Sequence, residues 1–231
     1  MVQLTPQHPY LTLRLKFKKV GSLQYISHLD LVRTMSKIIT RARLPLWYTE
    51  GFNPKPKMIF AAPLSIGTES ECEFMDLRMN EYIDPAEAMA RINANMTSEM
   101  QITEAYYPDS KFTDLKWMSY RLSFTPVAID DDLVKLCNDM LSLDTVEVLK
   151  KNSDQTINIR PLIKSAVASR VGDSIVVDAV LSADPSAFLN PEYIVKYLKE
   201  KCGLLSHPDL TAEHYEIMRL NAYFGDMTEF R

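Results

Sequence analysis

The order in which strand and helix patterns follow one another constrains this chain most. Apolar and polar residues alternate over Leu11–Lys18, which predicts a half-buried strand. Apolar residues at helical spacing then predict a helix from a Ser27 cap to about Ala42. After it the sequence predicts two strands, a helix capped by Asp84 and a last strand, at Met58–Pro63, Glu71–Met79, Pro85–Ala94 and Gln101–Tyr106.

The second half of the chain repeats this order, although its residues do not match those of the first half. The strands and helices predicted there are Tyr120–Phe124, Ile129–Leu141, Val146–Lys150, Ser174–Leu181, Pro191–Lys201 and Tyr215–Phe224. The order β-α-β-β-α-β is that of the ferredoxin-like fold. We therefore expect an α+β protein of two tandem ferredoxin-like lobes, residues 1–107 and 117–231, joined by a linker over residues 108–116.

Composition excludes several classes of protein. The three cysteines, Cys72, Cys137 and Cys202, lie far apart and form no CxxC pair, so we expect neither a zinc site nor a disulfide framework. Met1–Tyr10 has no apolar core of a signal peptide, and no apolar run approaches the roughly 18 residues that a membrane span needs. We expect a cytoplasmic protein that does not contact a membrane.

Charge is divided unevenly along the chain. The net charge is −4, but residues 1–60 carry ten Lys and Arg against two acids, and the remainder carries a net −12. Such asymmetry indicates a positive surface for an anionic partner on an otherwise acidic body. The alternative is that the two oppositely charged halves attract each other.

Three of these cations fall on one face of the first predicted helix. Arg33, Lys37 and Arg41 follow one another at intervals of four residues, and Asp30 is the acid at helical spacing to them. Arginine and lysine on one face suit a phosphate backbone. A solvated helix face without a partner is the alternative interpretation.

A loop follows the helix, because Pro54 and Pro56 each disfavour helix at the residue before. It combines an aromatic ring, an amide and two cations: Phe52, Asn53, Lys55 and Lys57. Aromatic rings among cations are typical of proteins that bind single-stranded RNA. For the neighbouring Trp47 and Phe60 we favour a place in the core.

His28 and Asp30 are the candidates for acid–base chemistry. A histidine can act as a general acid or base near neutral pH. The alternative is a structural histidine at a helix end, which is the commoner role of a lone histidine. The chain has no P-loop or GxGxxG motif, and the order of its residues suggests no Ser-His-Asp or Cys-His arrangement.

The motifs of this region resemble those of the radical SAM-linked protein family, a bacterial domain of unknown function. The segments that carry the resemblance are Gly21–Asp30, Arg33, Leu44–Leu46, Glu50–Lys57, Phe60–Leu64 and Gly67–Ser70, with Ile159–Pro161 and Ile163–Lys164 further on. Many relatives have a histidine where Lys55 stands, which puts a catalytic role for this position in doubt.

The resemblance implies a protein partner. Family members are typically encoded beside, or fused to, a radical SAM protein, which would carry the iron–sulfur cluster and S-adenosylmethionine. This chain has no CxxxCxxC motif, so we expect it to hold neither cofactor itself.

Three hypotheses about function follow. The first is an accessory RNA-binding protein that works with a radical SAM enzyme in RNA modification. In it the five cations of the helix and loop contact phosphates, and Phe52 and Asn53 contact a base. The second is an enzyme that uses His28 and Asp30 on RNA or a nucleotide. The third is a structural subunit that docks a radical SAM protein without contacting substrate.

Overall fold

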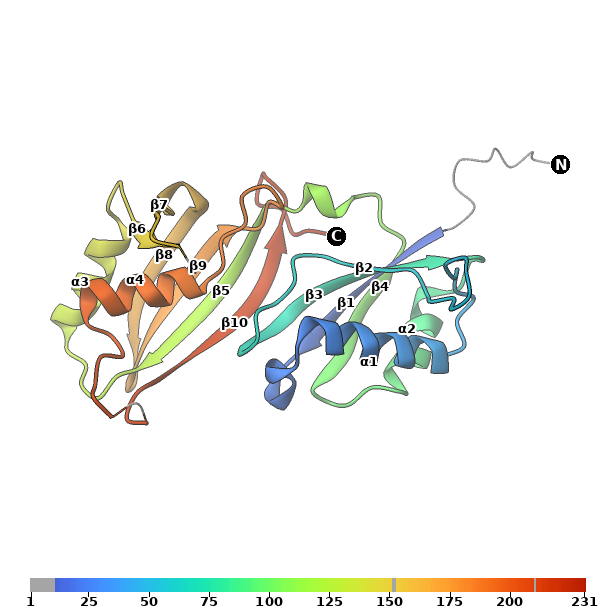
Figure 1. Cartoon of the computed structure of the whole chain (residues 1–231), viewed down its shortest axis with the longest axis horizontal. Coiled ribbons are helices and arrows are strands. Elements are labelled where there is room, and N and C mark those ends of the chain that lie inside the picture. Colours follow the sequence, from blue (N-terminus) through green and yellow to red (C-terminus); the bar gives the residue numbers. More distant parts are fainter. Residues whose placement is uncertain (1–10, 151–152, 210) are drawn as a thin grey trace. The chain divides into compact units, whose positions relative to one another are not determined.

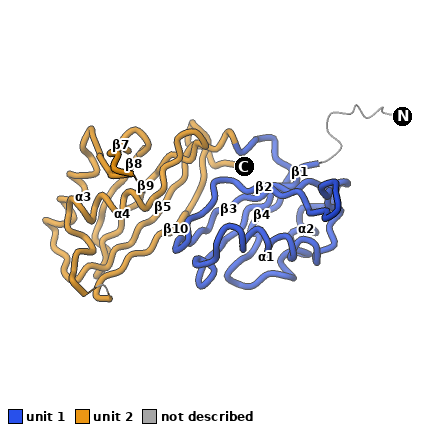
Figure 2. The backbone as a smooth tube through the Cα atoms, viewed as in Figure 1, with its two compact units in different colours: residues 1–112, 231 blue, residues 113–230 orange. Residues whose placement is uncertain are grey.

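A computed structural model of the chain describes residues 11–150, 153–209 and 211–231. The chain forms two compact units, Met1–Phe112 with Arg231 and Thr113–Phe230, which Figure 2 shows in two colours. We call them unit 1 and unit 2. Strands and helices occur in both (Figure 1), which confirms the prediction of an α+β protein. The prediction made for Met1–Tyr10 lies outside the described residues.

Unit 1 has an antiparallel sheet in which the strand order is β4-β1-β3-β2. Its elements are β1 (Leu11–Lys19), α1 (His28–Arg41), β2 (Met58–Phe60), β3 (Thr68–Met79), α2 (Pro85–Asn93) and β4 (Met100–Tyr106), with a short 3-10 helix η1 (Gly21–Tyr25). Between α1 and β2, Leu46 and Tyr48 form isolated bridges to Met79 and Pro56.

Unit 1 is held together by one apolar core. Leu13, Leu15 and Phe17 alternate along β1 and are fully buried, as their sequence pattern predicts. Leu31 and Met35 bring the apolar face of α1 into the same core. The helix begins where the sequence places its cap, because the Ser27 hydroxyl accepts a hydrogen bond from the Asp30 amide. This orientation leaves the other face of α1 in solvent.

Unit 2 has an antiparallel sheet with the order β10-β5-β9-β8 and a separate hairpin of β6 and β7. Its elements are β5 (Trp117–Thr125), α3 (Asp131–Leu141), β6 (Glu147–Leu149), β7 (Thr156–Asn158), β8 (Ile163–Val171), β9 (Ser174–Ser182), α4 (Glu192–Cys202) and β10 (His214–Tyr223). Short 3-10 helices lie at η2 (Phe112–Asp114) and η3 (Arg160–Leu162).

One strand of unit 2 was not predicted. Val146–Lys150 was expected in the main sheet, but β6 pairs only with β7, and β8 is the strand beside β9. The sequence of β8 has no alternating apolar pattern, because small and polar residues occupy most of Ile163–Val171. Of its residues, Ile163 and Ala168 alone are buried. Exposed edge strands lack the regular alternation on which the prediction depends.

An asparagine from a helix binds the backbone of an edge strand in each unit. Asn93, the last residue of α2, donates to the Ile102 carbonyl at 2.9 Å and accepts from the Ile102 amide at 2.7 Å. Asn138 of α3 does the same to Ala168 of β8, with both distances at 2.9 Å. At the edge of each sheet, the asparagine side chain thus supplies the donor and the acceptor that the backbone of a further strand would otherwise provide.

We expect Asn93→Ala to lower the free energy of unfolding by about 1–3 kcal/mol, because it leaves the amide and the carbonyl of buried Ile102 without their partner. Asn95→Ala is the matched control at the same helix end. The Asn95 side chain is exposed, and within the described residues it bonds to the Arg91 carbonyl alone, so its loss should cost within about 0.5 kcal/mol. Urea unfolding measures both, and equal losses would contradict a special role for Asn93.

In the part of the chain that the structure describes, no helix combines the length and the apolar character that crossing a membrane requires. The three cysteines are buried, and no disulfide links any two of them.

Candidate nucleic-acid interface

The cationic face of α1 lies in solvent. Arg33, Lys37 and Arg41 are exposed, whereas the opposite face of the helix is buried in the core of unit 1. Arg33 forms an ion pair with Asp30 at 3.4 Å, and both side chains are more than half exposed. Such a pair contributes little to stability. Within the described residues, no ion pair neutralises Lys37 or Arg41, so most of the charge of this face is available to a partner.

Two more cations lie at the end of this helix. The Arg91 guanidinium donates to the Arg43 carbonyl at 3.4 Å, which brings α2 beside the residue that follows α1. Arg91 also pairs with Glu87 one turn earlier in its own helix. Arg43 is exposed. Sequence reasoning missed Arg91, because 48 residues separate it from Arg43 and no local pattern links them.

The loop after α1 is anchored to β3 at its base. The Trp47 amide donates to the Arg78 carbonyl, the Arg78 amide to the Lys57 carbonyl, and the Lys57 amide to the Trp47 carbonyl, at 2.9–3.1 Å. Further out, the Thr49 amide donates to the Lys55 carbonyl at 2.9 Å, and the Lys55 amide donates to the Thr49 hydroxyl at 3.1 Å. Five bonds therefore fix both ends of the segment that contains the tip.

The tip of this loop presents an aromatic ring to solvent. Phe52 has a relative exposure of 112%, which is more than that of any other large apolar residue described. Gly51 before it has φ of 123°, a backbone conformation that glycine adopts without the strain of a side chain. Asn53 and Lys55 are exposed next to it, and Lys57 is partly exposed. The whole ring of Phe52 is therefore accessible to a partner from solvent.

Two neighbouring aromatics belong to the body of unit 1. Phe60 is partly buried and packs against the core, where its ring meets that of Phe17 edge-on. Trp47 is also partly buried, and the Arg78 guanidinium lies 5.9 Å from the centre of its ring. Phe60 thus packs against the core, whereas Trp47 lies at the base of the loop outside the core cluster.

His28 and Asp30 do not form a hydrogen-bonded pair among the described residues. The exposed His28 ring packs edge-on against Phe60, with ring centres 5.5 Å apart. The Asp30 carboxylate accepts a hydrogen bond from the Ser27 hydroxyl at 2.7 Å and pairs with Arg33. Asp30 thus completes the start of α1, and His28 is a helix-end residue that solvent can reach.

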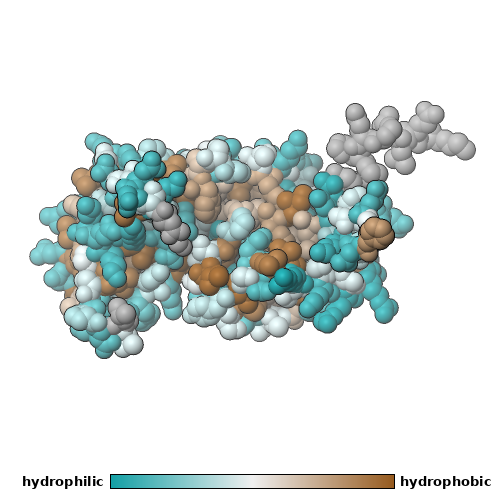
Figure 3. Space-filling model, viewed as in Figure 1, coloured by the Kyte–Doolittle hydropathy of each residue, from teal (hydrophilic) through white to brown (hydrophobic). Residues whose placement is uncertain are grey.

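Exposed apolar residues lie beside the start of α1. Tyr25, Leu29 and Ile66 are each more than half exposed. The Gly67 amide donates to the Gln24 carbonyl at 2.9 Å, which holds the segment of Ile66 against that of Tyr25. In Figure 3 hydrophobic surface lies near this end of α1, and hydrophilic surface near its other end. We call Tyr25, Leu29 and Ile66 the apolar patch.

One family model matches most of the chain. Its description is "Uncharacterized protein conserved in bacteria (DUF2344)", and it matches residues 12–191, which include the helix face, the loop and the apolar patch. No curated protein matches the sequence.

Two solved structures match the chain over most of its length. One is a chain of a Cbf5-Nop10-Gar1 complex, with 9% identity and a TM-score of 0.50 over 94% of this chain and 50% of that chain. The other is a chain of the archaeal box H/ACA sRNP Nop10-Cbf5 complex, with 8% identity and a TM-score of 0.47 over 92% and 48%. The chain thus spans about half the length of both.

Proposed function

Since the chain belongs to DUF2344, a bacterial family described as uncharacterized, we propose its function from its own residues: an accessory RNA-binding protein that works with a radical SAM enzyme. The observation that carries the proposal is the full exposure of Phe52 on an anchored loop that also holds Lys55 and Lys57. An exposed ring can stack on any base, and nearby cations can contact the backbone on either side of it.

The arrangement suits a single strand better than a duplex. Stacking requires a base whose face is free, which single strands and loops supply. The rigid base of the loop limits the conformational entropy that binding would cost, because the backbone from Thr49 to Lys55 is already closed by hydrogen bonds. Arg33, Lys37 and Arg41 then extend the positive surface along α1, and Asn53 offers an amide to a base edge.

The test is RNA binding over a salt series with a fluorescent single-stranded RNA. Lys55→Gln with Lys57→Gln should weaken binding and reduce the slope of log K against log salt by about 1.4, since each contact with a single strand contributes about 0.7. Phe52→Ala should cost about 1–3 kcal/mol of binding free energy and leave the slope unchanged, because stacking releases no counterions.

The matched control is Lys199→Gln with Lys201→Gln on α4, where both lysines are exposed and the change in net charge is the same. The control should leave binding close to that of the wild type. If the wild type binds no RNA, or if the loop and control variants weaken binding equally, the proposal fails.

The partner in this proposal is a radical SAM protein. Its support is the resemblance carried by the Gly21–Asp30 and Glu50–Lys57 motifs, which implies a partner that supplies the iron–sulfur cluster and S-adenosylmethionine. In this proposal the chain presents RNA and the partner performs the chemistry. The His28 and Asp30 enzyme hypothesis has no comparable support, because Asp30 is engaged with Ser27 and Arg33.

The apolar patch favours a second candidate function, that of a docking subunit which contacts no RNA. Contiguous exposed apolar side chains commonly mark a protein interface. Purification of the protein from its native cell distinguishes the two candidate functions. A partner protein that stays bound at high salt, with no RNA in the complex, would favour the docking subunit; RNA that is lost from the complex as salt rises would favour the first proposal.

We also propose that each unit is a ferredoxin-like lobe. The support is topological: unit 1 has the strand order β4-β1-β3-β2 and unit 2 has β10-β5-β9-β8, each antiparallel throughout. In each, one helix follows the first strand of the sheet and another precedes the last. The hairpin of β6 and β7 is then an insertion in the second lobe.

A further inference from the structure

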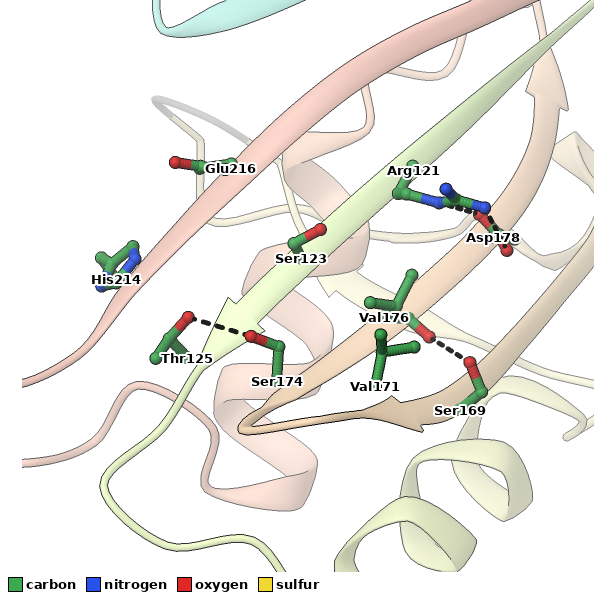
Figure 4. A pocket seen from close by; sticks show the side chains of 10 residues that line it. All are labelled: Arg121, Ser123, Thr125, Ser169, Val171, Ser174, Val176, Asp178, His214 and Glu216. Atoms are coloured by element: carbon green, nitrogen blue, oxygen red, sulfur yellow. Dashed lines mark hydrogen bonds and ion pairs between the residues drawn. The ribbon is translucent and has the colours of Figure 1, made fainter.

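Unit 2 has a hollow of about 530 Å³ on one face of its sheet (Figure 4). Residues along each strand alternate between two environments. Leu122, Phe124 and Val177 are fully buried, whereas Ser123 and Asp178, next to them in sequence, line the hollow. The strands therefore turn apolar residues toward the core and polar residues toward the hollow, as expected of an antiparallel sheet with one solvated face.

The strand register arranges the lining side chains in three rows across the sheet. One row holds Val171, Ser174, Thr125 and His214. The next holds Ser169, Val176, Ser123 and Glu216. The third holds Asp178 and Arg121. Neighbouring strands are about 4.8 Å apart, so a row of four side chains spans about 14 Å, which is room for a small molecule.

Some of the polar groups in the hollow are paired and others are open to a ligand. Arg121 binds Asp178 through two hydrogen bonds of 2.8 and 3.1 Å, and the Thr125 and Ser174 hydroxyls lie 3.3 Å apart. Among the described residues, the side chains of Ser123 and Glu216 have no hydrogen-bond partner. They lie on neighbouring strands, since Glu216 of β10 is in register with Ser123 of β5, and in Figure 4 their polar atoms point away from each other.

The charge and composition of the hollow limit what it can bind. Asp178 neutralises Arg121, so Glu216 gives the described lining a net negative charge. A phosphate would be repelled there. The described lining contains no Phe, Tyr or Trp, and the imidazole of His214 is its one ring. The hollow is therefore unlike the cationic, aromatic surface of unit 1, and it needs a different class of ligand.

We propose that this hollow binds a neutral, polyhydroxylated small molecule of the sugar class. A carboxylate accepts hydrogen bonds from two neighbouring hydroxyl groups, which Glu216 can do. The Ser123 hydroxyl both donates and accepts, and the outer N–H groups of Arg121 donate to ligand oxygens. Val171 and Val176 offer apolar contact to the C–H face of a ring. This site is in unit 2 and does not depend on RNA binding by unit 1.

The test is a titration of the full chain with D-ribose, followed by amide chemical shifts in NMR spectra. Shifts should change with millimolar ribose at residues of β5, β8, β9 and β10. D-ribose 5-phosphate, which adds a charged group, should bind more weakly. Glu216→Gln should weaken ribose binding about tenfold, the loss expected for a hydrogen bond to a charged group. The same variant should also reduce the difference in affinity between D-ribose and D-ribose 5-phosphate, since it removes the repulsion between the Glu216 carboxylate and the phosphate.

Two further variants complete the test. Glu200→Gln, at an exposed position of α4 outside the hollow, should leave ribose binding unchanged. Ser169→Trp fills the hollow from an exposed position of the edge strand and should abolish binding. No shift with millimolar ribose, shifts spread over other elements, or equal binding by Glu216→Gln and the wild type would each overturn the proposal.

Discussion

Replacing Arg14 with methionine is expected to lower the free energy of unfolding by about 3–5 kcal/mol, because the change leaves a carboxylate buried without its partner. Arg14 lies on β1 with 1% of its side chain exposed, and it binds Asp76 of β3 through hydrogen bonds of 2.7 and 2.9 Å. Its remaining N–H groups reach the hydroxyl and the carbonyl of Ser110 at 2.7 and 3.1 Å. The guanidinium also lies over the Phe112 ring.

The pH dependence of this loss follows from Asp76. Burial raises the pKa of the Asp76 carboxyl from its ordinary 3.8, and the hydrogen bonds and charge of Arg14 oppose the rise. Without Arg14 only the effect of burial remains, so folding of the variant favours the protonated acid. The destabilisation should therefore be small below about pH 3.8 and develop as pH rises through the pKa of the folded state.

Arg121→Met is a matched control for this prediction. Arg121 binds Asp178 with the same two-bond geometry, at 2.8 and 3.1 Å, but both side chains are about half exposed. Its loss should cost about 0–1 kcal/mol. Arg14→Met with Asp76→Leu should recover most of the stability, since no buried charge remains. Urea unfolding measures the free energy of unfolding of the three variants. Equal losses for Arg14→Met and Arg121→Met would contradict the special role of the buried pair.

The network around Arg14 also shows what a strand pattern cannot predict. Alternation correctly places Leu13 and Leu15 in the core and puts Arg14 on the other face of the sheet, where a charged residue would be expected in solvent. It is instead buried by Ser110 and Phe112 and bound by Asp76. These partners are 62–98 residues away in the sequence, so no window of local pattern contains them.

Local signals were sufficient for other parts of the molecule. The Ser27 cap and the spacing of Leu31, Met35 and Ile38 predicted α1 nearly to the residue, because a helix is specified by neighbours within one or two turns. The loop before β2 was predictable from Pro54 and Pro56 for the same reason. What the sequence left open was the exposure of Phe52, which depends on hydrogen bonds from Trp47, Lys57 and Arg78 that hold the loop away from the core.

Reversing the charge of Arg33, Lys37 and Arg41 to glutamate is expected to lower RNA affinity by at least about 100-fold at 0.1 M salt. Each contact between a cation and a single strand contributes about 0.7 to the slope of log K against log salt. At about 0.1 M salt the loss of each cation therefore lowers RNA affinity about fivefold, before the repulsion between glutamate and phosphate is added. All three side chains are exposed, so the core of unit 1 is untouched. Arg33→Glu places a second negative charge three residues after Asp30. This like-charge pair lowers the stability of the helix by only about 0.5 kcal/mol or less.

The control for this variant separates position from total charge. Lys135, Lys199 and Lys201 are exposed on α3 and α4, and changing all three to glutamate alters the net charge by the same amount. If the α1 variant alone loses RNA while the proposed radical SAM partner still co-purifies, the helix face binds RNA and the docking surface lies elsewhere, as proposed for the apolar patch. If both triple variants lose RNA equally, the α1 face is only a solvated helix surface and RNA binding by that face is ruled out.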